Sequence, residues 1–239
     1  MSLYSQLMTD YKHAVEMTFV ADARYKMFLS GLGVTLEITV GALLLGVLIG
    51  TTVAILRVYH HQTGRMKFLN FLMNCYLTIF RGTPVVVQLM IWYFVVFMSL
   101  NNPILVAIVA FGVNSGAYVA EIARAGIMAV DIGQTEAGRS LGLSAWQTMR
   151  FIVLPQAFKN VLPALSNELI SLLKETSVVG YIAVVDLTKA ADLVRARTFQ
   201  AFMPLLFVAV TYLLMVLILT QFQRLLEARL RASDRRLAK

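Results

Sequence analysis

The sequence has little charge and only one cysteine. Asp, Glu, Lys and Arg make up 14% of the 239 residues, against roughly 25% in an average soluble domain. The single Cys75 excludes a disulfide within one chain and a cysteine-based metal site. No Gly-x-x-x-x-Gly-Lys-Ser/Thr segment occurs, so the chain lacks the phosphate-binding loop of an ATPase. These absences disfavour both a soluble enzyme and a disulfide scaffold.

The sequence also lacks a catalytic constellation. No Ser/His/Asp or paired-carboxylate arrangement stands out. His60 and His61 are adjacent, but no third ligand lies close to them, so we predict no metal site. We therefore expect a protein that is not an enzyme and that holds no cofactor of its own.

Long apolar runs dominate what is present, since 59% of the residues are apolar. A membrane-spanning helix needs about 20 mostly apolar residues. The candidate spans are residues 28–56, 68–99, 103–128, 160–185 and 201–223. The second is interrupted at Arg81-Gly82-Thr83-Pro84, and the fourth is weaker because it carries several charged residues. The pattern predicts an all-α polytopic membrane protein with about five transmembrane helices.

The net charge of +8 indicates an orientation in the membrane. Lys and Arg stand between the apolar runs and in a C-terminal cluster, without the interleaved aromatics of a nucleic-acid-binding surface. The two loops after the first and third spans, with the tail, hold more than twice as many positive residues as the opposite side. The positive-inside rule therefore places the N-terminus outside and the C-terminus in the cytoplasm. Residues 1–27 are polar, so we expect no cleavable signal peptide.

The longest segment between spans, residues 129–159, is expected in the cytoplasm and reads as helical. Ser144 is a candidate N-cap for an amphipathic run that Pro155 stops or kinks. Gly142 allows a sharp turn between two short helices. Glu136 is expected to cap a helix or to pair within the loop.

This loop resembles the "EAA" loop of membrane subunits of ATP-binding-cassette importers. The family pattern is Glu-Ala-Ala, three residues, Gly, nine residues, Ile, one residue, Leu and Pro. The sequence meets that spacing with one departure, Gly138 for the second Ala, which costs about 1 kcal/mol of helix propensity. The resemblance implies a pair of short helices that docks on a cytoplasmic ATPase through Glu136, Ala137, Gly138, Gly142, Leu154 and Pro155.

Other segments resemble the polar amino acid uptake branch of these permeases, from about residue 30 to residue 230. They are Arg81-Gly82-Thr83-Pro84 with Gln88, Asn114-Ser115-Gly116-Ala117-Tyr118 with Glu121, Leu154-Pro155-Gln156-Ala157, and Lys174-Glu175-Thr176-Ser177. The resemblance implies a type I importer permease fold, with residues 1–27 extracytoplasmic, 28–226 the transmembrane domain, 129–159 its cytoplasmic coupling loop, and 227–239 a basic cytoplasmic tail.

The resemblance also implies a function and partners. The chain is expected to import polar amino acids, glutamine-type favoured, across a prokaryotic cytoplasmic membrane by alternating access. The expected partners are a cassette ATPase dimer that binds the ATP, a second permease subunit (itself or a sister chain) and an extracytoplasmic substrate-binding protein. The chain is further expected to contact membrane lipid and a small amino acid, and no nucleic acid.

Polar residues inside the spans are candidates for a substrate pathway, because charges there usually face a cavity or a partner. One helical face carries Asn114, Tyr118 and Glu121, and a second carries Arg81, Gln88 and Trp92. Arg81 is a candidate for the substrate carboxylate, or for a structural pair with a neighbouring acid. Pro84 breaks the second span, which either frees a carbonyl for substrate or is filled by packing. The full set is Arg81, Thr83, Gln88, Asn114, Tyr118, Glu121, Glu175 and Ser177.

Two alternatives remain open from the sequence. Buried acids such as Glu121 and Glu175 also suit an ion-coupled transporter or a gated pore. The small-residue pattern Gly46-x-x-x-Gly50 suits helix packing either within the chain or between subunits.

Overall fold

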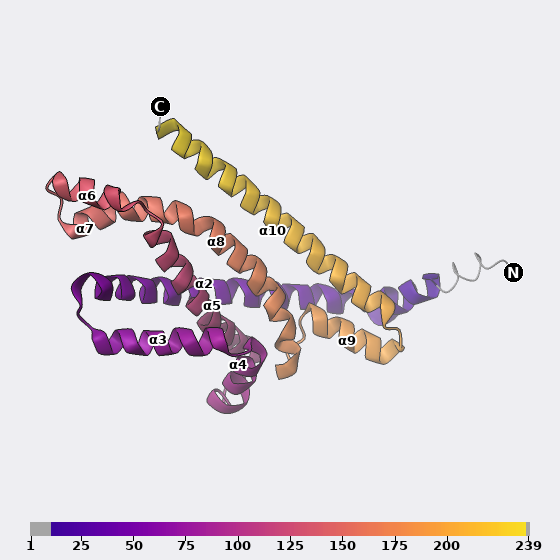
Figure 1. Cartoon of the computed structure of the whole chain (residues 1–239). Coiled ribbons are helices and arrows are strands. Elements are labelled where there is room, and N and C mark those ends of the chain that lie inside the picture. Colours follow the sequence, from indigo (N-terminus) through magenta and orange to yellow (C-terminus); the bar gives the residue numbers. More distant parts are fainter. Residues whose placement is uncertain (1–10, 238–239) are drawn as a thin grey trace.

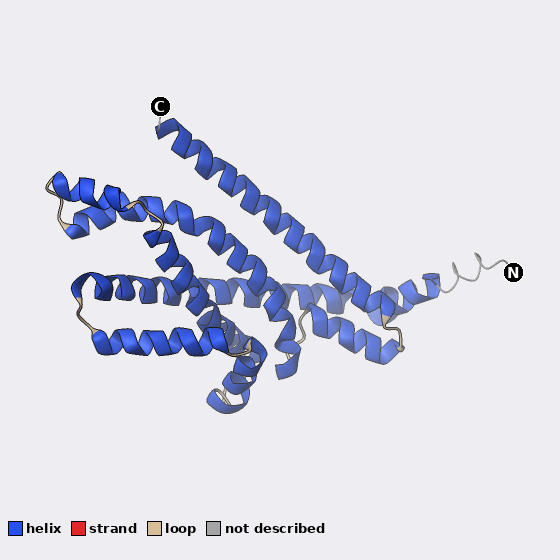
Figure 2. Ribbon diagram, in the orientation of Figure 1, coloured by secondary structure: helices blue, strands red, loops and turns tan. Residues whose placement is uncertain are grey.

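The computed structural model describes residues 11–237, and the regular elements in that range are all helices (Figures 1 and 2). In chain order they are η1 (Glu16–Val20), η2 (Ala21–Ala23), α2 (Tyr25–Thr63), α3 (Lys67–Gly82), α4 (Val85–Ile91), η3 (Trp92–Val96), α5 (Pro103–Met128), α6 (Ile132–Ser140), α7 (Ala145–Thr148), η4 (Met149–Val153), α8 (Leu154–Glu175), η5 (Thr176–Ile182), α9 (Leu187–Thr198) and α10 (Phe202–Leu237). Residues 1–10 of the expected N-terminal segment and residues 238–239 of the expected tail lie outside this range.

Among residues 11–237, three helices are long and apolar enough to cross a membrane, namely α2, α5 and α10. They match the first, third and last expected spans. The helix α5 begins where the sequence predicted, because Asn102 caps it by accepting from the backbone N–H of Leu105, and Pro103 occupies its first turn.

The second expected span is broken, as the sequence predicted. The helix α3 ends at Gly82 and α4 begins at Val85, and the two segments differ in direction by 111°. Thr83 is extended, with φ of −121° and ψ of 149°, which is the conformation favoured before a proline. Counting this bent pair as one span brings the number of spans to four.

The helix α8 takes the place of the fourth expected span, residues 160–185, but it begins at Leu154 and is more polar than α2, α5 and α10. Its 22 residues correspond to about 33 Å, which is long enough to cross a hydrocarbon layer. It includes Lys159, Glu168, Lys174 and Glu175 and does not pass as a span by composition. The five-span arrangement is reached only when this polar helix is included, so its charged residues need protein or water around them.

The centre of the fold is the contact between α2 and α5, which is more extensive than any other helix pair. A Cβ added to Gly50 would lie 2.6 Å from the Cβ of Val119 and 2.7 Å from the carbonyl oxygen of Gly116. A Cβ added to Gly46 would lie 2.9 Å from the hydroxyl of Ser115. The small-residue pattern on α2 is therefore used within the chain, and this decides between the two open interpretations.

Gly50→Ala is expected to lower the stability of the folded chain by about 1–3 kcal/mol, because the new methyl group meets backbone and β-branched atoms that cannot move aside. Thermal unfolding in detergent measures the effect. Gly33→Ala on the same helix is the control, since no atom lies within 4 Å of its added Cβ. Equal melting temperatures for the two variants would contradict this account of the packing.

Buried apolar side chains form three clusters around this pair. The largest joins α2, α4, α5, α8 and η5, and includes Ile38, Leu89 and Phe111. A second joins α2, α9 and α10 around Phe28, where the rings of Phe19 and Phe207 lie 5.6 and 5.0 Å from that of Phe28. The N-terminal helical turns are thereby attached to the bundle.

The connections gather at two ends of the molecule. The α2–α3 turn and the pair α6–α7 lie towards one end, and the N-terminal turns and α9 lie towards the other (Figure 1). This agrees with the alternation of loops that the expected spans require.

Candidate functional site

The break between α3 and α4 is repaired by two amide side chains. Pro84 has no N–H, so the carbonyl of Phe80, one turn earlier, loses its helical partner. The side-chain amides of Gln88 and Asn114 each donate to that carbonyl at 3.0 Å. Gln88 also donates to the hydroxyl of Thr83 at 2.7 Å and to its carbonyl at 3.1 Å. The freed carbonyl is thus satisfied inside the chain, as in the interpretation in which packing fills the break.

Gln88 and Asn114 also bind each other, with the Asn114 amide donating to Gln88 Oε1 at 2.9 Å. Both are buried, at 7% and 3% exposed. The polar residues Gln88 of α4 and Asn114 of α5 therefore meet. Arg81 does not share a helical face with Gln88 and Trp92, however, because the 111° bend separates α3 from the segment Val85–Val96 that carries the other two residues.

Gln88→Leu and Asn114→Leu are each expected to cost about 1–3 kcal/mol of stability, since each leaves buried polar groups without a partner. The double variant is expected to cost less than the sum, because each single change already breaks the shared hydrogen bond. Unfolding of the three variants in detergent gives the coupling energy. Strict additivity would mean that the two amides do not act together.

Glu121 on α5 is the centre of an ion-pair cluster. The Nε of Arg124 donates to its carboxylate at 3.0 Å, and a second nitrogen of the same guanidinium also pairs with it. Arg57 on α2 and Arg81 on α3 approach the other oxygen at 3.5 and 4.0 Å. The guanidinium of Arg81 also lies over the ring of Tyr118, 5.6 Å from its centre.

This cluster corresponds to the interpretation in which Arg81 pairs with a neighbouring acid. One carboxylate faces three guanidinium groups, so Glu121 is not free to take a substrate ammonium group. Arg81 is the most exposed of the three arginines, at 42% of its side chain, and the farthest from Glu121. It is therefore the arginine with the most freedom to take another anion.

The acids of α8 are held differently. Glu168 accepts from the hydroxyl of Ser115 at 2.8 Å, which links α8 to α5. Glu175 is the last residue of α8, and it has no hydrogen bond or ion pair within the described part of the chain. Glu175 is thus the candidate acid left available for a positively charged group.

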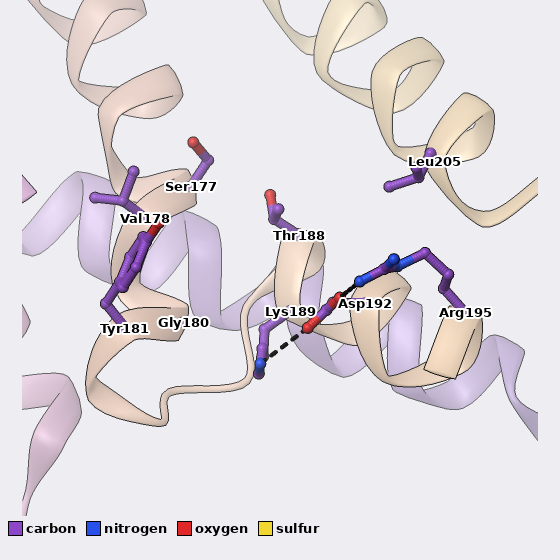
Figure 3. A pocket seen from close by; sticks show the side chains of 9 residues that line it. All are labelled: Ser177, Val178, Gly180, Tyr181, Thr188, Lys189, Asp192, Arg195 and Leu205. Carbon is purple, nitrogen blue, oxygen red and sulfur yellow. Dashed lines mark hydrogen bonds and ion pairs between the residues drawn. The ribbon is translucent and has the colours of Figure 1, made fainter. Parts of the chain in front are cut away.

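Ser177, two residues after Glu175, lines a groove bounded by η5, α9 and α10 (Figure 3). Lys189, Asp192 and Arg195 of α9 also line this groove. Sequence reasoning missed these three residues, although their i, i+3 spacing was visible. It also counted Arg57 and Arg124 only as orientation signals, since nothing local shows that they meet Glu121.

The expected coupling loop is a hairpin of short helices. Asp131 caps α6 by accepting from the N–H of Gly133. Gly142 has a φ of +87°, which ends α6 in a conformation that favours glycine. Ser144 then caps α7, and Gln147 completes a capping box with it. The predicted turn at Gly142 and N-cap at Ser144 are both confirmed.

The buried side of this hairpin explains the unusual glycine of the motif. Gly138 is buried, and a Cβ there would lie 2.8 Å from Ile152 and 2.9 Å from the methyl group of Thr148. The departure from alanine therefore lets α6 lie close against α7 and η4. The closer packing of α6 against α7 and η4 offsets the lower helix propensity of glycine at position 138.

One expectation about the hairpin is wrong, and a second is only partly right. The side chain of Glu136 is exposed and takes part in none of the hydrogen bonds or ion pairs of the described residues, because Asp131 caps the helix instead. Pro155 does not stop the run from Ser144, since α7, η4 and α8 follow one another with helical backbone angles. The π-helical turn η4 lies directly before Pro155 and lets the helix continue past the missing N–H.

The outer face of the hairpin is apolar for an exposed loop. Leu141 is 81% exposed and Trp146 is 65% exposed, and Ile132 and Phe151 are also exposed. Ala137, Leu154 and Pro155 lie in the same exposed segment. Large apolar residues that are exposed in one short segment indicate a contact with another protein or with the membrane surface.

Known proteins resemble the chain over most of its length. The family model described as "Binding-protein-dependent transport system inner membrane component" matches residues 42–232. The arginine transport system permease protein ArtQ of Bacillus subtilis is 38% identical, covering 86% of this chain and 93% of that protein. The glutamine transport system permease protein GlnP of Escherichia coli is 36% identical, with coverage of 86% and 93%.

A solved structure extends the similarity to the fold. The crystal structure of an amino acid ABC transporter with histidines matches with a TM-score of 0.80 and 40% sequence identity. The match covers 88% of this chain and 98% of that one.

Proposed function

Because the chain belongs to the family of binding-protein-dependent transport system inner membrane components, we propose that it imports polar amino acids as the permease subunit of an ATP-binding-cassette transporter. The observation that carries this proposal is the match, over more than four fifths of the chain, to permeases and a transporter of amino acids. Membership in the family implies separate ATPase subunits, a binding protein and a second permease.

Glutamine is the substrate we favour. Support comes from the similarity to a glutamine permease, while the similarity to an arginine permease keeps a cationic amino acid as the nearest competitor. Glu175 is the single acid of the described pathway that has no partner. One acid can balance the α-ammonium group of glutamine, but it cannot also balance the charged side chain of a cationic amino acid. Arg81, whose pair with Glu121 is the longest of the cluster, takes the α-carboxylate at a separate point of the pathway, because Glu121 and Glu175 lie several helical turns apart along α5 and α8.

The remaining pathway residues fix the geometry of the broken span α3–α4 and the position of Arg81. Gln88, Asn114 and Thr83 hold the α3–α4 bend through the carbonyl of Phe80, and Tyr118 supports Arg81. In this proposal they line a pathway whose geometry changes when α5 moves. Ser177 follows Glu175 closely and belongs to the outer end of the same pathway.

The α6–α7 hairpin, within a cytoplasmic loop of residues 129–159, transmits the motion of the ATPases. Its exposed face of Glu136, Ala137, Leu154 and Pro155 docks on the ATPase, and Gly138 and Gly142 give it its shape. When two ATPase subunits close around ATP, they would draw two such hairpins together. The transmembrane domain, residues 28–226, would then change from an inward-open to an outward-open state. Relaxation would then release the amino acid inward.

Because the hairpin docks on cytoplasmic ATPases, its position fixes the orientation of the chain in the membrane in our proposal. The α2–α3 turn and the basic tail from residue 227 lie in the cytoplasm, and the segment before residue 28 lies outside. The ion-coupled alternative loses one of its two acids, because Glu121 is held by three arginines rather than free to exchange protons.

Reconstitution tests the function. The chain, a cassette ATPase and an extracytoplasmic binding protein from the same source are placed in liposomes, and radiolabelled glutamine and arginine are supplied outside. Uptake that requires ATP, the ATPase and the binding protein supports the proposal. Uptake driven by a proton gradient in the absence of the ATPase would overturn it.

A further inference from the structure

The groove beside Ser177 is a built concave site separate from the Glu121 cluster. It has a volume of about 440 Å³ and lies between η5, α9 and α10. Figure 3 shows Val178 and Tyr181 on the η5 side, Leu205 on α10, and the charged residues of α9 between them. This volume falls in the range of small-molecule pockets, roughly 300–1,000 Å³.

Three charges line the groove along one face of α9. Lys189 pairs with one oxygen of Asp192 at 3.0 Å, and Arg195 pairs with the other oxygen at 2.5 Å. The two bases hold the pKa of the Asp192 carboxyl below its ordinary value, with the hydrogen bond from Arg195 as the first cause. The Asp192 carboxylate therefore compensates only one of the two positive charges that flank it.

The other walls offer polar and apolar surfaces. The hydroxyls of Ser177 and Thr188 lie on the side of η5 and the start of α9. Tyr181 and Leu205 are both exposed and provide apolar surface. The groove therefore offers two cationic groups, one acid, the hydroxyls of Ser177 and Thr188, and apolar surface. A zwitterionic amino acid carries the complementary groups, a carboxylate, an ammonium group and a side chain.

We propose that this groove is an outer station for the free amino acid, where Lys189 and Arg195 take the α-carboxylate and Asp192 takes the α-ammonium group. The inference rests on the proposed function and deepens it. In the proposed orientation α9 lies on the extracytoplasmic side, where a binding protein releases its cargo. Ser177 connects the groove to the end of α8, where Glu175 is available as the next acid. The substrate's carboxylate and ammonium group replace the ion pairs within the triad. Because the triad loses its own ion pairs when the substrate binds, binding is weak and reversible.

The test compares neutralising variants on α9 in the complete transporter. Lys189→Gln and Arg195→Gln are expected to raise the KM for glutamine about threefold to tenfold with little change in Vmax, as suits partly exposed charges. Arg197→Gln is the matched control, because Arg197 lies on the same helix but does not line the groove. A KM for the groove variants equal to that of Arg197→Gln would overturn the inference.

Two further measurements distinguish an amino acid site from a surface that only contacts the binding protein. Asp192→Asn is expected to reduce the preference for glutamine over glutaramate, which lacks the ammonium group; an unchanged preference would contradict the role of Asp192. Weaker docking of the ligand-free binding protein, with unchanged direct binding of radiolabelled glutamine to the permease–ATPase complex, would make the groove a protein contact and overturn the proposal. Failure of the unsubstituted transporter to take up any amino acid would refute the proposed function instead.

Discussion

Gly142→Val is expected to reduce ATP-driven uptake at least about tenfold. Gly142 has a φ of +87°, a conformation that costs a β-branched residue about 1–3 kcal/mol or more. The substitution therefore displaces α7 relative to α6 and misplaces the face that docks on the ATPase. Because no atom lies within 4 Å of an added Cβ at this position, the effect acts through the backbone rather than through a clash.

Gly64→Val provides the matched control for the hairpin. Gly64 also has a positive φ, of +66°, and has open space around it, but it ends α2 in a different turn, between α2 and α3. Both variants bear similar strain, so a similar small loss of melting temperature is expected. Uptake and the binding of the ATPase to the permease in detergent are the two readouts. An equal loss of uptake in both variants would mean that strain alone, and not coupling, explains the result.

Glu121→Gln is expected to destabilise the folded chain by about 3 kcal/mol. The change removes the one acid that faces three guanidinium groups from α2, α3 and α5, and their mutual repulsion is then uncompensated. The value is at the low end for a broken buried pair, because Glu121 is 28% exposed and water screens part of the repulsion. Thermal unfolding in detergent at low salt gives the loss, and added salt is expected to reduce it.

Two companion variants make this prediction specific. Glu37→Gln removes an exposed acid on α2 that has no ion pair within residues 11–237, and it is expected to leave the melting temperature unchanged. Adding Arg57→Gln to Glu121→Gln removes one of the repelling charges and is expected to recover part of the lost stability. A stability loss that arises equally in Glu37→Gln would refute the cluster as its cause.

The helical elements could be predicted well from the sequence, with exceptions that have physical reasons. Apolar runs predicted α2, α5 and α10 because each run by itself meets the length and composition that a membrane requires. The proline at 84 predicted the break, since it acts on its own helix turn. Pro155 did not stop its run, because the π-helical turn η4 directly before it lets the helix continue past the missing N–H.

The candidate site was predictable in its residues but not in its pairings. Arg81, Gln88, Asn114 and Glu121 stood out as polar groups within apolar runs. The sequence could not show that Arg57 reaches Glu121, since the two lie 64 residues apart and meet only when α2 packs on α5. It could not show that Gln88 donates to Phe80 either, because that contact depends on the bend that follows Gly82.

The sequence by itself determined the class of protein, the positions of three apolar spans, the break in a further span, and the turn at Gly142 with the N-cap at Ser144. These properties depend on residues that are near neighbours along the chain, so local composition and turn chemistry are enough to specify them. Only the tertiary structure decided that Gly46 and Gly50 pack against α5, that Glu121 is shared by three helices, and that α9 bounds a charged groove. Each of these depends on which helix faces which, and that is decided by the close packing of the whole bundle rather than by any one segment.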